Sequence, residues 1–204
     1  MMIQKEYDQK LLKAANNEYK YLLGGKRFCM MDSFEKAYDS MGAVKQKWVS
    51  PAFVSDEQYE EEWLRQSFSD AGYKSENKVY KTKQGEEVRS KSELIIANAL
   101  FEKKIPYRYE YPLTDSGRIW AVPDFTVLNV CERKEYYWEH FGMMGDPEYA
   151  RNTMKKIRSY EKHHMFPGNE VIYTFESDEV QINVESIEDI IVTYFGRKYR
   201  PNLD

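Results

Sequence analysis

Two stretches of the chain each place one acid among apolar and aromatic residues. The first is Val122–Val127, which carries Asp124, and the second is Tyr136–Gly142, which carries Glu139. Both are rich in β-branched and aromatic residues, so we expect each to form a strand. Side chains alternate along a strand, so the two carboxylates can meet on one face if these strands pair as a hairpin. Two carboxylates at such a short distance repel one another unless a cation lies between them. Oxygen ligands suit Mg²⁺ or Mn²⁺.

A third acid, Glu93, precedes both strands and begins an apolar segment, Leu94–Phe101. This segment is predicted to be a mostly buried helix. Glu93 lies four residues before Ala97 and seven before Leu100, so it falls on the apolar stripe of that helix. The order along the chain is therefore an acid on a helix, a strand, the Asp124 strand, the Glu139 strand and a further helix.

The further helix is predicted to begin at Asp146-Pro147-Glu148 and to end near Lys162. An acid at the N-cap, proline at the first helical position and an acid in the first turn are typical of a helix start. Two neighbouring stripes follow from the helical period. The first, expected to pack on the core, is Ala150, Met154 and Ile157. The second is Thr153, Lys156 and Tyr160, from which Lys156 and Tyr160 can reach the carboxylates.

Three short runs resemble the PD-(D/E)XK nuclease superfamily: Arg89–Glu93, Pro123-Asp124-Phe125 and Trp138–Gly142. The resemblance covers roughly residues 86 to 195. It implies a restriction-endonuclease-like core in which Asp124 and Glu139, the backbone carbonyl of His140 and Glu93 hold Mg²⁺ or Mn²⁺. The third motif of the superfamily is Glu-x-Lys, whereas Phe141 stands two residues after Glu139 in this chain. A lysine must then come from another element, and Lys156 on the following helix is the residue we expect.

Contacts with DNA are predicted at Arg89, Lys91 and Tyr160. Arg89 and Lys91 precede the start of the Glu93 helix, and a helix N-terminus favours phosphate. Ordinary solvation of the two cations is the competing interpretation. Tyr160 can donate to a phosphate or stack on a base, although a tyrosine at helical spacing is more often part of a core.

The composition describes a polar chain without a membrane span or a signal peptide. Its 204 residues include 30 basic and 34 acidic ones, a net charge of -4, which counts against broad coating of DNA but leaves room for a local basic patch. There is no apolar run of about 18 residues, and the N-terminus lacks an apolar segment. Cys29 and Cys131 are expected to be reduced thiols, and a cytoplasmic location is the simple interpretation.

We expect three regions: a helical region over residues 1–70, a linker with a short strand over 71–85, and a nuclease-like domain over 86–204. The basic residues of the first region form either a solvated helix surface, the more ordinary interpretation, or a nucleic-acid face. In the third region the elements follow the order α-β-β-β-α-β-α. A meander of three strands, followed by a helix that crosses to a fourth strand, predicts an α/β (α+β) fold with a mixed four-stranded sheet flanked by helices.

The favoured function is an Mg²⁺-dependent nuclease that hydrolyses the phosphodiester bonds of DNA, with an endonuclease preferred. Asp124, Glu139, Glu93 and Lys156 would be its catalytic residues. The alternative is a nuclease-like fold that no longer cuts and serves as a DNA-binding or interaction module, because the Glu-x-Lys lysine is missing. RNA ranks lower as a substrate, and the sequence leaves the oligomeric state open, with a homodimer among the choices.

Overall fold

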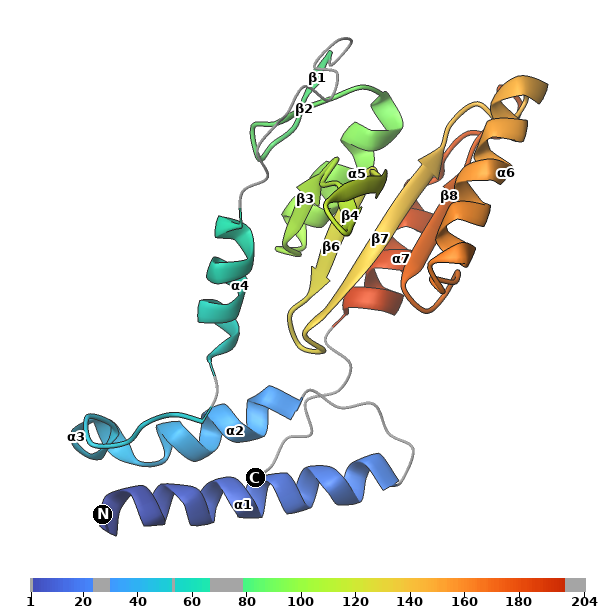
Figure 1. Cartoon of the computed structure of the whole chain (residues 1–204). Helices are drawn as coiled ribbons and strands as arrows, with labels where there is room; N and C mark the ends of the chain where they lie inside the picture. Colours follow the sequence, from blue (N-terminus) through green and yellow to red (C-terminus); the bar gives the residue numbers. More distant parts are fainter. Residues whose placement is uncertain (1, 24–29, 53, 67–78, 197–204) are drawn as a thin grey trace. The chain divides into compact units, whose positions relative to one another are not determined.

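A computed structural model describes residues 2–23, 30–52, 54–66 and 79–196 (Figure 1). The chain forms two compact units. The first contains the helices up to Trp63 together with Val130–Arg133, and the second comprises Leu64–Asn129 and Lys134–Phe195. No helix among these described ranges is long and apolar enough to cross a membrane.

The first unit is helical, with α1 (Met2–Leu23), α2 (Met30–Asp39), α3 (Gly42–Gln46) and the greater part of α4 (Asp56–Arg65). Its small core contains Tyr7, Met41 and Val49. The start of α4 has the reciprocal hydrogen bonds of a capping box: Gln58 N donates to Ser55 Oγ at 3.2 Å, and Ser55 N donates to Gln58 Oε1 at 3.3 Å. These helices lie within residues 1–70, the region predicted to be helical.

The second unit is built on a mixed four-stranded sheet in the order β3-β6-β7-β8. Its strands are β3 (Tyr107–Tyr109), β6 (Phe125–Asn129), β7 (Lys134–Phe141) and β8 (Val171–Phe175). The first three pair antiparallel in a meander, and β8 pairs parallel to β7 after the chain crosses through α6. The predicted meander, crossover and α+β class are thus confirmed.

Helices cover both faces of this sheet, and the alternation along β7 shows which face each helix covers. Trp138 of β7 packs with α5 (Lys91–Glu102) and α7 (Val184–Phe195) in the main hydrophobic core, which also contains Ile96 and Ile191. Tyr137 points the other way and packs with Tyr160 of α6 (Pro147–Lys162) in a second cluster. Even-numbered residues of β7 therefore face α5 and α7, and odd-numbered residues face α6.

Two small hairpins accompany the sheet. The short strand predicted near residues 79–82 is β1 (Tyr80–Lys81), which pairs with β2 (Glu87–Val88). The second hairpin, β4 (Leu113–Asp115) with β5 (Arg118–Ala121), was not predicted as a separate sheet. Ser116 and Gly117 both have positive φ there, 49° and 77°, as a tight two-residue turn requires. Glu110 also has a positive φ of 48°, and β3 ends directly before it, at Tyr109.

The predicted stripes of α6 are exchanged in the structure. Its N-terminus is as expected, because Asp146 Oδ1 accepts hydrogen bonds from Glu148 N and Tyr149 N. Its buried residues are Thr153 and Tyr160, whereas Met154 is 52% exposed, so the prediction that Met154 packs on the core is wrong. The helix is rotated so that its more polar stripe covers the sheet.

Cys131 forms a disulfide. The prediction of a reduced thiol at this position is therefore wrong. The other cysteine, Cys29, lies outside the described residues.

Candidate functional site

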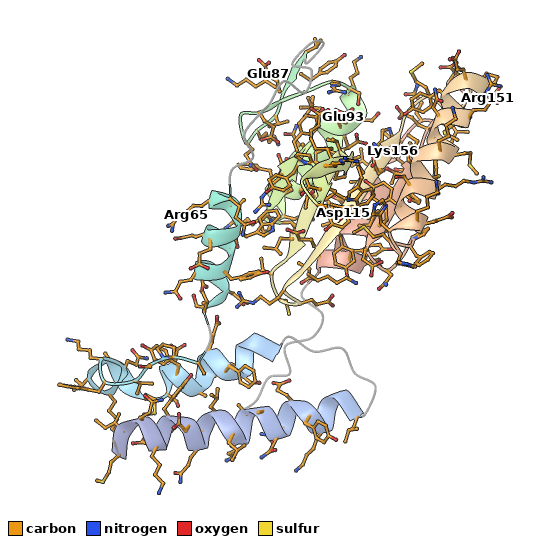
Figure 2. The ribbon with its side chains drawn as sticks, viewed as in Figure 1. Arg65, Glu87, Glu93, Asp115, Arg151 and Lys156 are labelled. Carbon is orange, nitrogen blue, oxygen red and sulfur yellow. The ribbon has the colours of Figure 1, made fainter. Side chains whose placement is uncertain are left out.

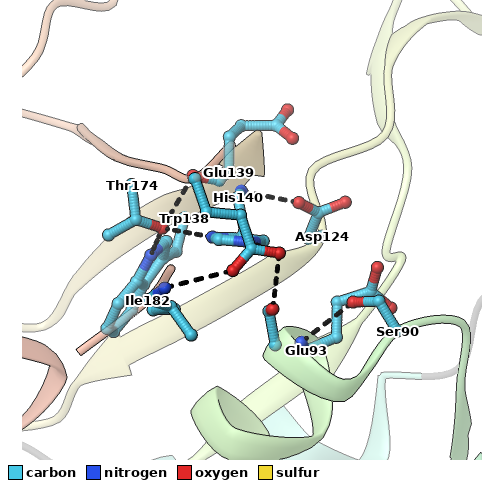
Figure 3. A network of polar contacts seen from close by, with 10 residues as sticks. Ser90, Glu93, Asp124, Trp138, Glu139, His140, Thr174 and Ile182 are labelled. Carbon is cyan, nitrogen blue, oxygen red and sulfur yellow. Dashed lines mark hydrogen bonds and ion pairs between the residues drawn. The ribbon is translucent and has the colours of Figure 1, made fainter. Parts of the chain in front are cut away.

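Asp124 and Glu139 lie side by side on the face of the sheet that α6 covers. Phe125 pairs with Trp138 in the antiparallel register of β6 and β7, which places the preceding Asp124 opposite the following Glu139. Asp124 precedes β6 directly, and its Oδ2 accepts a hydrogen bond from His140 N at 2.7 Å (Figure 3). The predicted meeting of the two carboxylates is found, and a backbone donor of β7 orients one of them.

Glu139 is fully buried and has two partners on α6. Lys156 Nζ donates to its Oε2 at 2.5 Å, and Tyr160 Oη donates to its Oε1 at 2.6 Å. The two donors come four residues apart on one helix, which brings both side chains to the same carboxylate. Burial raises the pKa of Glu139, and the Lys156 ammonium and Tyr160 hydroxyl act against that shift.

Lys156 supplies the cation of the site. Burial by itself would lower the pKa of this ammonium, but the charges of Glu139 and Asp124 outweigh burial and raise the pKa above its ordinary value. The side chain is 35% exposed, so the ammonium touches both the buried acid and solvent. Figure 2 shows Lys156 on the inner side of α6, whereas Arg151 lies near the outer end of the helix. The predicted reach of Lys156 to the carboxylates is confirmed, and its catalytic role stays a prediction.

The ionisation of Asp124 is strongly perturbed. Burial, followed by the neighbouring charge of Glu139, raises the pKa of Asp124 to about 7, and Glu93 adds a smaller effect in the same direction. Lys156 and the His140 N–H act against this shift. A single lysine therefore does not balance the negative charge of both carboxylates. A carboxyl group poised near neutral pH beside a second acid is typical of a functional site.

Glu93 caps the helix on which it lies. Ser90 Oγ accepts a hydrogen bond from Glu93 N at 3.1 Å, and Glu93 Oε2 accepts from Arg89 N at 2.9 Å. The same Oε2 accepts from Tyr109 Oη at 2.6 Å, and the pKa of this tyrosine is raised by burial and by Glu93. Glu93 lies close enough to Asp124 to raise its pKa, so the third predicted acid adjoins the pair while it also holds the helix start.

A divalent cation fits the chemistry of these donors. Asp124 and Glu139 offer carboxylate oxygens, their burial disfavours two bare negative charges, and one lysine compensates only part of that charge. Among the described residues no group of three or more histidine, cysteine, aspartate or glutamate side chains is arranged to hold one metal ion. An ion at this position would be held by Asp124 and Glu139, with backbone or water oxygens completing its shell, and the His140 carbonyl is the predicted backbone ligand.

The three residues predicted to contact DNA differ in their exposure. Lys91 is exposed at the start of α5. Arg89 is 36% exposed and forms an ion pair with Glu110, with Nη2 2.6 Å from Oε1. The role of both in binding phosphate stays a prediction. Tyr160 is 0% exposed and its hydroxyl is bonded to Glu139, which counts against a contact with DNA, so this role too stays a prediction.

Two tyrosines next to the acids were not predicted. Tyr149 continues the stripe of Thr153 and Lys156 toward the N-terminus of α6, and its pKa is raised by burial and by Asp124 and Glu139. The spacing of four and three residues along this stripe could have indicated it. Tyr173 of β8 has a buried hydroxyl without a hydrogen-bond partner among the described residues, and burial together with Glu139 raises its pKa to about 12. No local pattern could have indicated Tyr173, because its nearness to Glu139 follows from the parallel pairing of β8 with β7.

Comparison with known proteins leaves the family of this chain open. No family model matches the chain, and no solved structure matches it. An uncharacterised protein of Methanocaldococcus jannaschii is 29% identical to it over 128 residues. The alignment covers 56% of this chain, and the chain spans 11% of that much longer protein. This similarity brings no activity with it.

Proposed function

We propose that this protein is a metal-dependent phosphodiesterase that cleaves DNA, with the PD-(D/E)XK nuclease superfamily as its family and a restriction-endonuclease-like core. One observation carries the proposal: Asp124, directly before β6, and Glu139 of the adjacent β7 share a face, and Lys156 Nζ reaches Glu139 at 2.5 Å. Two acids that can bind a divalent cation, with a lysine beside them, suit metal-assisted hydrolysis of a phosphodiester. Mg²⁺ or Mn²⁺ is the proposed cofactor.

Each residue has a distinct role in this proposal. Asp124 and Glu139 bind the cation, and Glu93 assists from the start of α5. A divalent cation, when bound there, lowers the pKa of a water molecule and neutralises charge on the scissile phosphate. Lys156 keeps its charge between the two carboxylates and solvent, where it can orient the attacking water or stabilise the developing negative charge. Tyr160 holds Glu139 in place through the hydrogen bond from its hydroxyl. Because Tyr160 is buried, it does not touch the substrate.

The rival proposal is a binding module that does not cut. It draws on Phe141, which stands where the superfamily has lysine and is 3% exposed, with ring centroids 5.6 Å and 5.5 Å from those of Tyr173 and Phe175. Because Phe141 carries no charge, that position of β7 supplies no cation to the site. The ion pair of Lys156 with Glu139 favours cleavage over this rival, because the missing charge returns from α6.

Incubation of the protein with plasmid, linear duplex and single-stranded DNA, and with RNA, in the presence and absence of Mg²⁺ or Mn²⁺ tests the proposal. We expect metal-dependent cleavage of DNA that is absent in Asp124→Asn. Plasmid cleavage would identify the endonuclease mode. Binding of DNA without cleavage by the wild-type protein under every metal condition would favour the rival, and cleavage of RNA alone would replace the substrate.

The location and assembly of the protein are also proposals. A cytoplasmic location agrees with the composition, but the disulfide at Cys131 counts against a reducing compartment. DNA is the proposed partner, and a homodimer would be consistent with cleavage of both strands.

A further inference from the structure

A second polar network lies on the opposite face of β7, directly behind the candidate site (Figure 3). The His140 ring points away from Glu139, as the alternation of the strand requires, and its side chain is 2% exposed. Its Nδ1 lies 3.0 Å from Thr174 Oγ1, which also accepts a hydrogen bond from Trp138 Nε1 at 3.0 Å. Its Nε2 lies 3.4 Å from Glu176 Oε1. The ring is therefore hydrogen-bonded at Nδ1, whereas Nε2 lies near the Glu176 carboxylate without a hydrogen bond among the described residues.

Glu176 connects three separate segments of the second unit. Its Oε1 accepts a hydrogen bond from Ser92 Oγ of α5 at 2.8 Å and lies beside His140 of β7. Its Oε2 accepts from Ile182 N, ahead of α7, at 3.2 Å. Burial would raise the pKa of this carboxyl, but its interactions with Ser92 and His140 outweigh burial and lower it. Glu176 is therefore an ionised, partly buried carboxylate that connects these three segments.

The backbone around Glu176 is fixed as well. Glu176 N donates to Phe141 O at 2.9 Å, which extends the pairing of β8 with β7 by one residue. Gly142 passes close to the network: a Cβ at this position would lie 3.2 Å from Glu176 Oε1 and 3.5 Å from His140 Nε2. A glycine at this position therefore leaves room for the carboxylate and the imidazole to approach each other.

The two ends of this network are bonded neighbours of the site residues. Ser92 directly precedes Glu93, and His140 directly follows Glu139. The backbone N–H of His140 donates to Asp124, so displacement of His140 also displaces the hydrogen-bond donor of that acid. The side chain of Glu176 thus links the start of α5 to the end of β7, the two places from which the acids project.

We propose that Glu176 is a positioning residue for the metal site: by binding Ser92 and His140 from behind the sheet, it sets the distance of Glu93 from Asp124 and Glu139. This inference rests on the proposed function. Groups that hold metal ligands in place affect metal affinity by about 10- to 100-fold when they are removed. Glu176 touches neither the proposed ion nor the substrate, so its effect would be on ion binding and rate, with little effect on the binding of DNA.

The first test measures Mn²⁺ binding by electron paramagnetic resonance, together with kcat and KM for DNA at saturating metal. Glu176→Gln keeps the shape of the side chain but removes its charge. We expect Mn²⁺ affinity to fall about 10- to 100-fold and kcat to fall, with KM for DNA unchanged. Glu170→Gln is the matched control: this carboxylate stands at the other end of β8, accepts from Phe166 N at 3.3 Å, and should leave all three quantities unchanged.

A second variant distinguishes a positioning role of Glu176 from a simple loss of folding. Ser92→Ala removes one hydrogen bond to Glu176 and should weaken Mn²⁺ binding several-fold in the wild-type background, but add little in the Glu176→Gln background, because both changes break one link. Additive effects of the two changes would overturn the link. Glu176→Gln that lowers only the Tm, with Mn²⁺ affinity and kcat unchanged well below that temperature, would overturn the positioning role alone. Wild-type protein that binds no Mn²⁺ would overturn the proposed function and this role with it.

Discussion

Lys156 Nζ lies 2.5 Å from Glu139 Oε2, across 17 residues of sequence. The strand position two residues after the glutamate is instead occupied by buried Phe141, which packs on Tyr173 and Phe175. The cation therefore reaches the acid from a helix laid over the sheet, and the strand keeps an apolar residue that anchors β7 to β8. This ion pair supplies the positive charge that the proposed chemistry needs beside the two acids.

Lys156→Ala should lower the cleavage rate by about 10²-fold or more, the scale for loss of one preorganised electrostatic donor. Its affinity for Mg²⁺ should stay the same or rise slightly, since Glu139 Oε2 loses a competing cation. Lys156→Arg should recover only part of the rate, because a planar guanidinium does not reproduce a compact ammonium. Single-turnover cleavage at saturating metal measures both effects.

Lys155→Ala is the control for that experiment. Lys155 is adjacent in sequence but exposed, and its ammonium binds Asn152 on the same helix at 3.2 Å. It should cleave at the wild-type rate. A wild-type rate in Lys156→Ala would assign the cation to another residue, with Lys91 and Arg89 next to be replaced.

The stability of the metal-free protein should fall as the pH rises from about 4 to about 7. The pKa of Asp124 is raised from 3.8 to about 7, so over this range the folded state holds a proton that the unfolded state has lost. The stabilisation is fully present below pH 4 and is lost once the pH exceeds 7. It amounts to at most about 4 kcal/mol, because one pKa unit corresponds to about 1.4 kcal/mol.

Urea unfolding of the wild type and Asp124→Asn across this pH range measures the effect by difference. The variant should lack this component and should be the more stable protein at pH 8 without metal. Mg²⁺ should remove the difference, because a cation beside Asp124 favours its charged form. Parallel pH profiles of the two proteins would contradict the raised pKa.

Glu139 and Lys156 should be coupled in stability. Lys156→Met leaves a buried carboxylate with only Tyr160 as its partner, and it should cost about 3 kcal/mol at pH 8. The loss should be smaller at lower pH, because burial raises the pKa of Glu139. The double variant Glu139→Gln/Lys156→Met should be clearly less destabilised than the sum of its two single variants. Denaturant unfolding of all four proteins gives the coupling, and additive losses would argue against a direct pair.

Tyr160→Phe should destabilise the protein by about 1.5 to 3 kcal/mol, the range for a lost hydrogen bond to a charged group. The ring keeps its packing, so the fold should be preserved, and the binding of DNA should be unchanged because Tyr160 is buried. Unfolding and a DNA titration measure the two quantities. Weaker DNA binding with unchanged stability would restore Tyr160 to the DNA surface.

Local sequence periods were sufficient to predict much of this protein. Alternation along a strand places Asp124 and Glu139 on one face of an antiparallel pair, and their types already indicate cation chemistry. Helical spacing brings Lys156 and Tyr160 to one stripe, and the capping residues Asp146 and Ser55 mark two helix starts. The meander and crossover followed from the order of strands and helices. These features depend on neighbours within a few residues, so the sequence by itself determined them.

Other features were decided only by the tertiary structure, because they depend on how distant elements pack. The rotation of α6 on the sheet buries Thr153 and Tyr160 and exposes Met154, against the apolar pattern of the helix. A buried carboxylate such as Glu139 is costly without polar partners, and this cost outweighs one more apolar contact with the sheet. The bond from Ser92 to Glu176 joins residues 84 positions apart. No local period contains such a pair. The sequence determined which groups were present and which of them share a strand face or a helix stripe, and long-range packing decided which stripe was buried and which groups met.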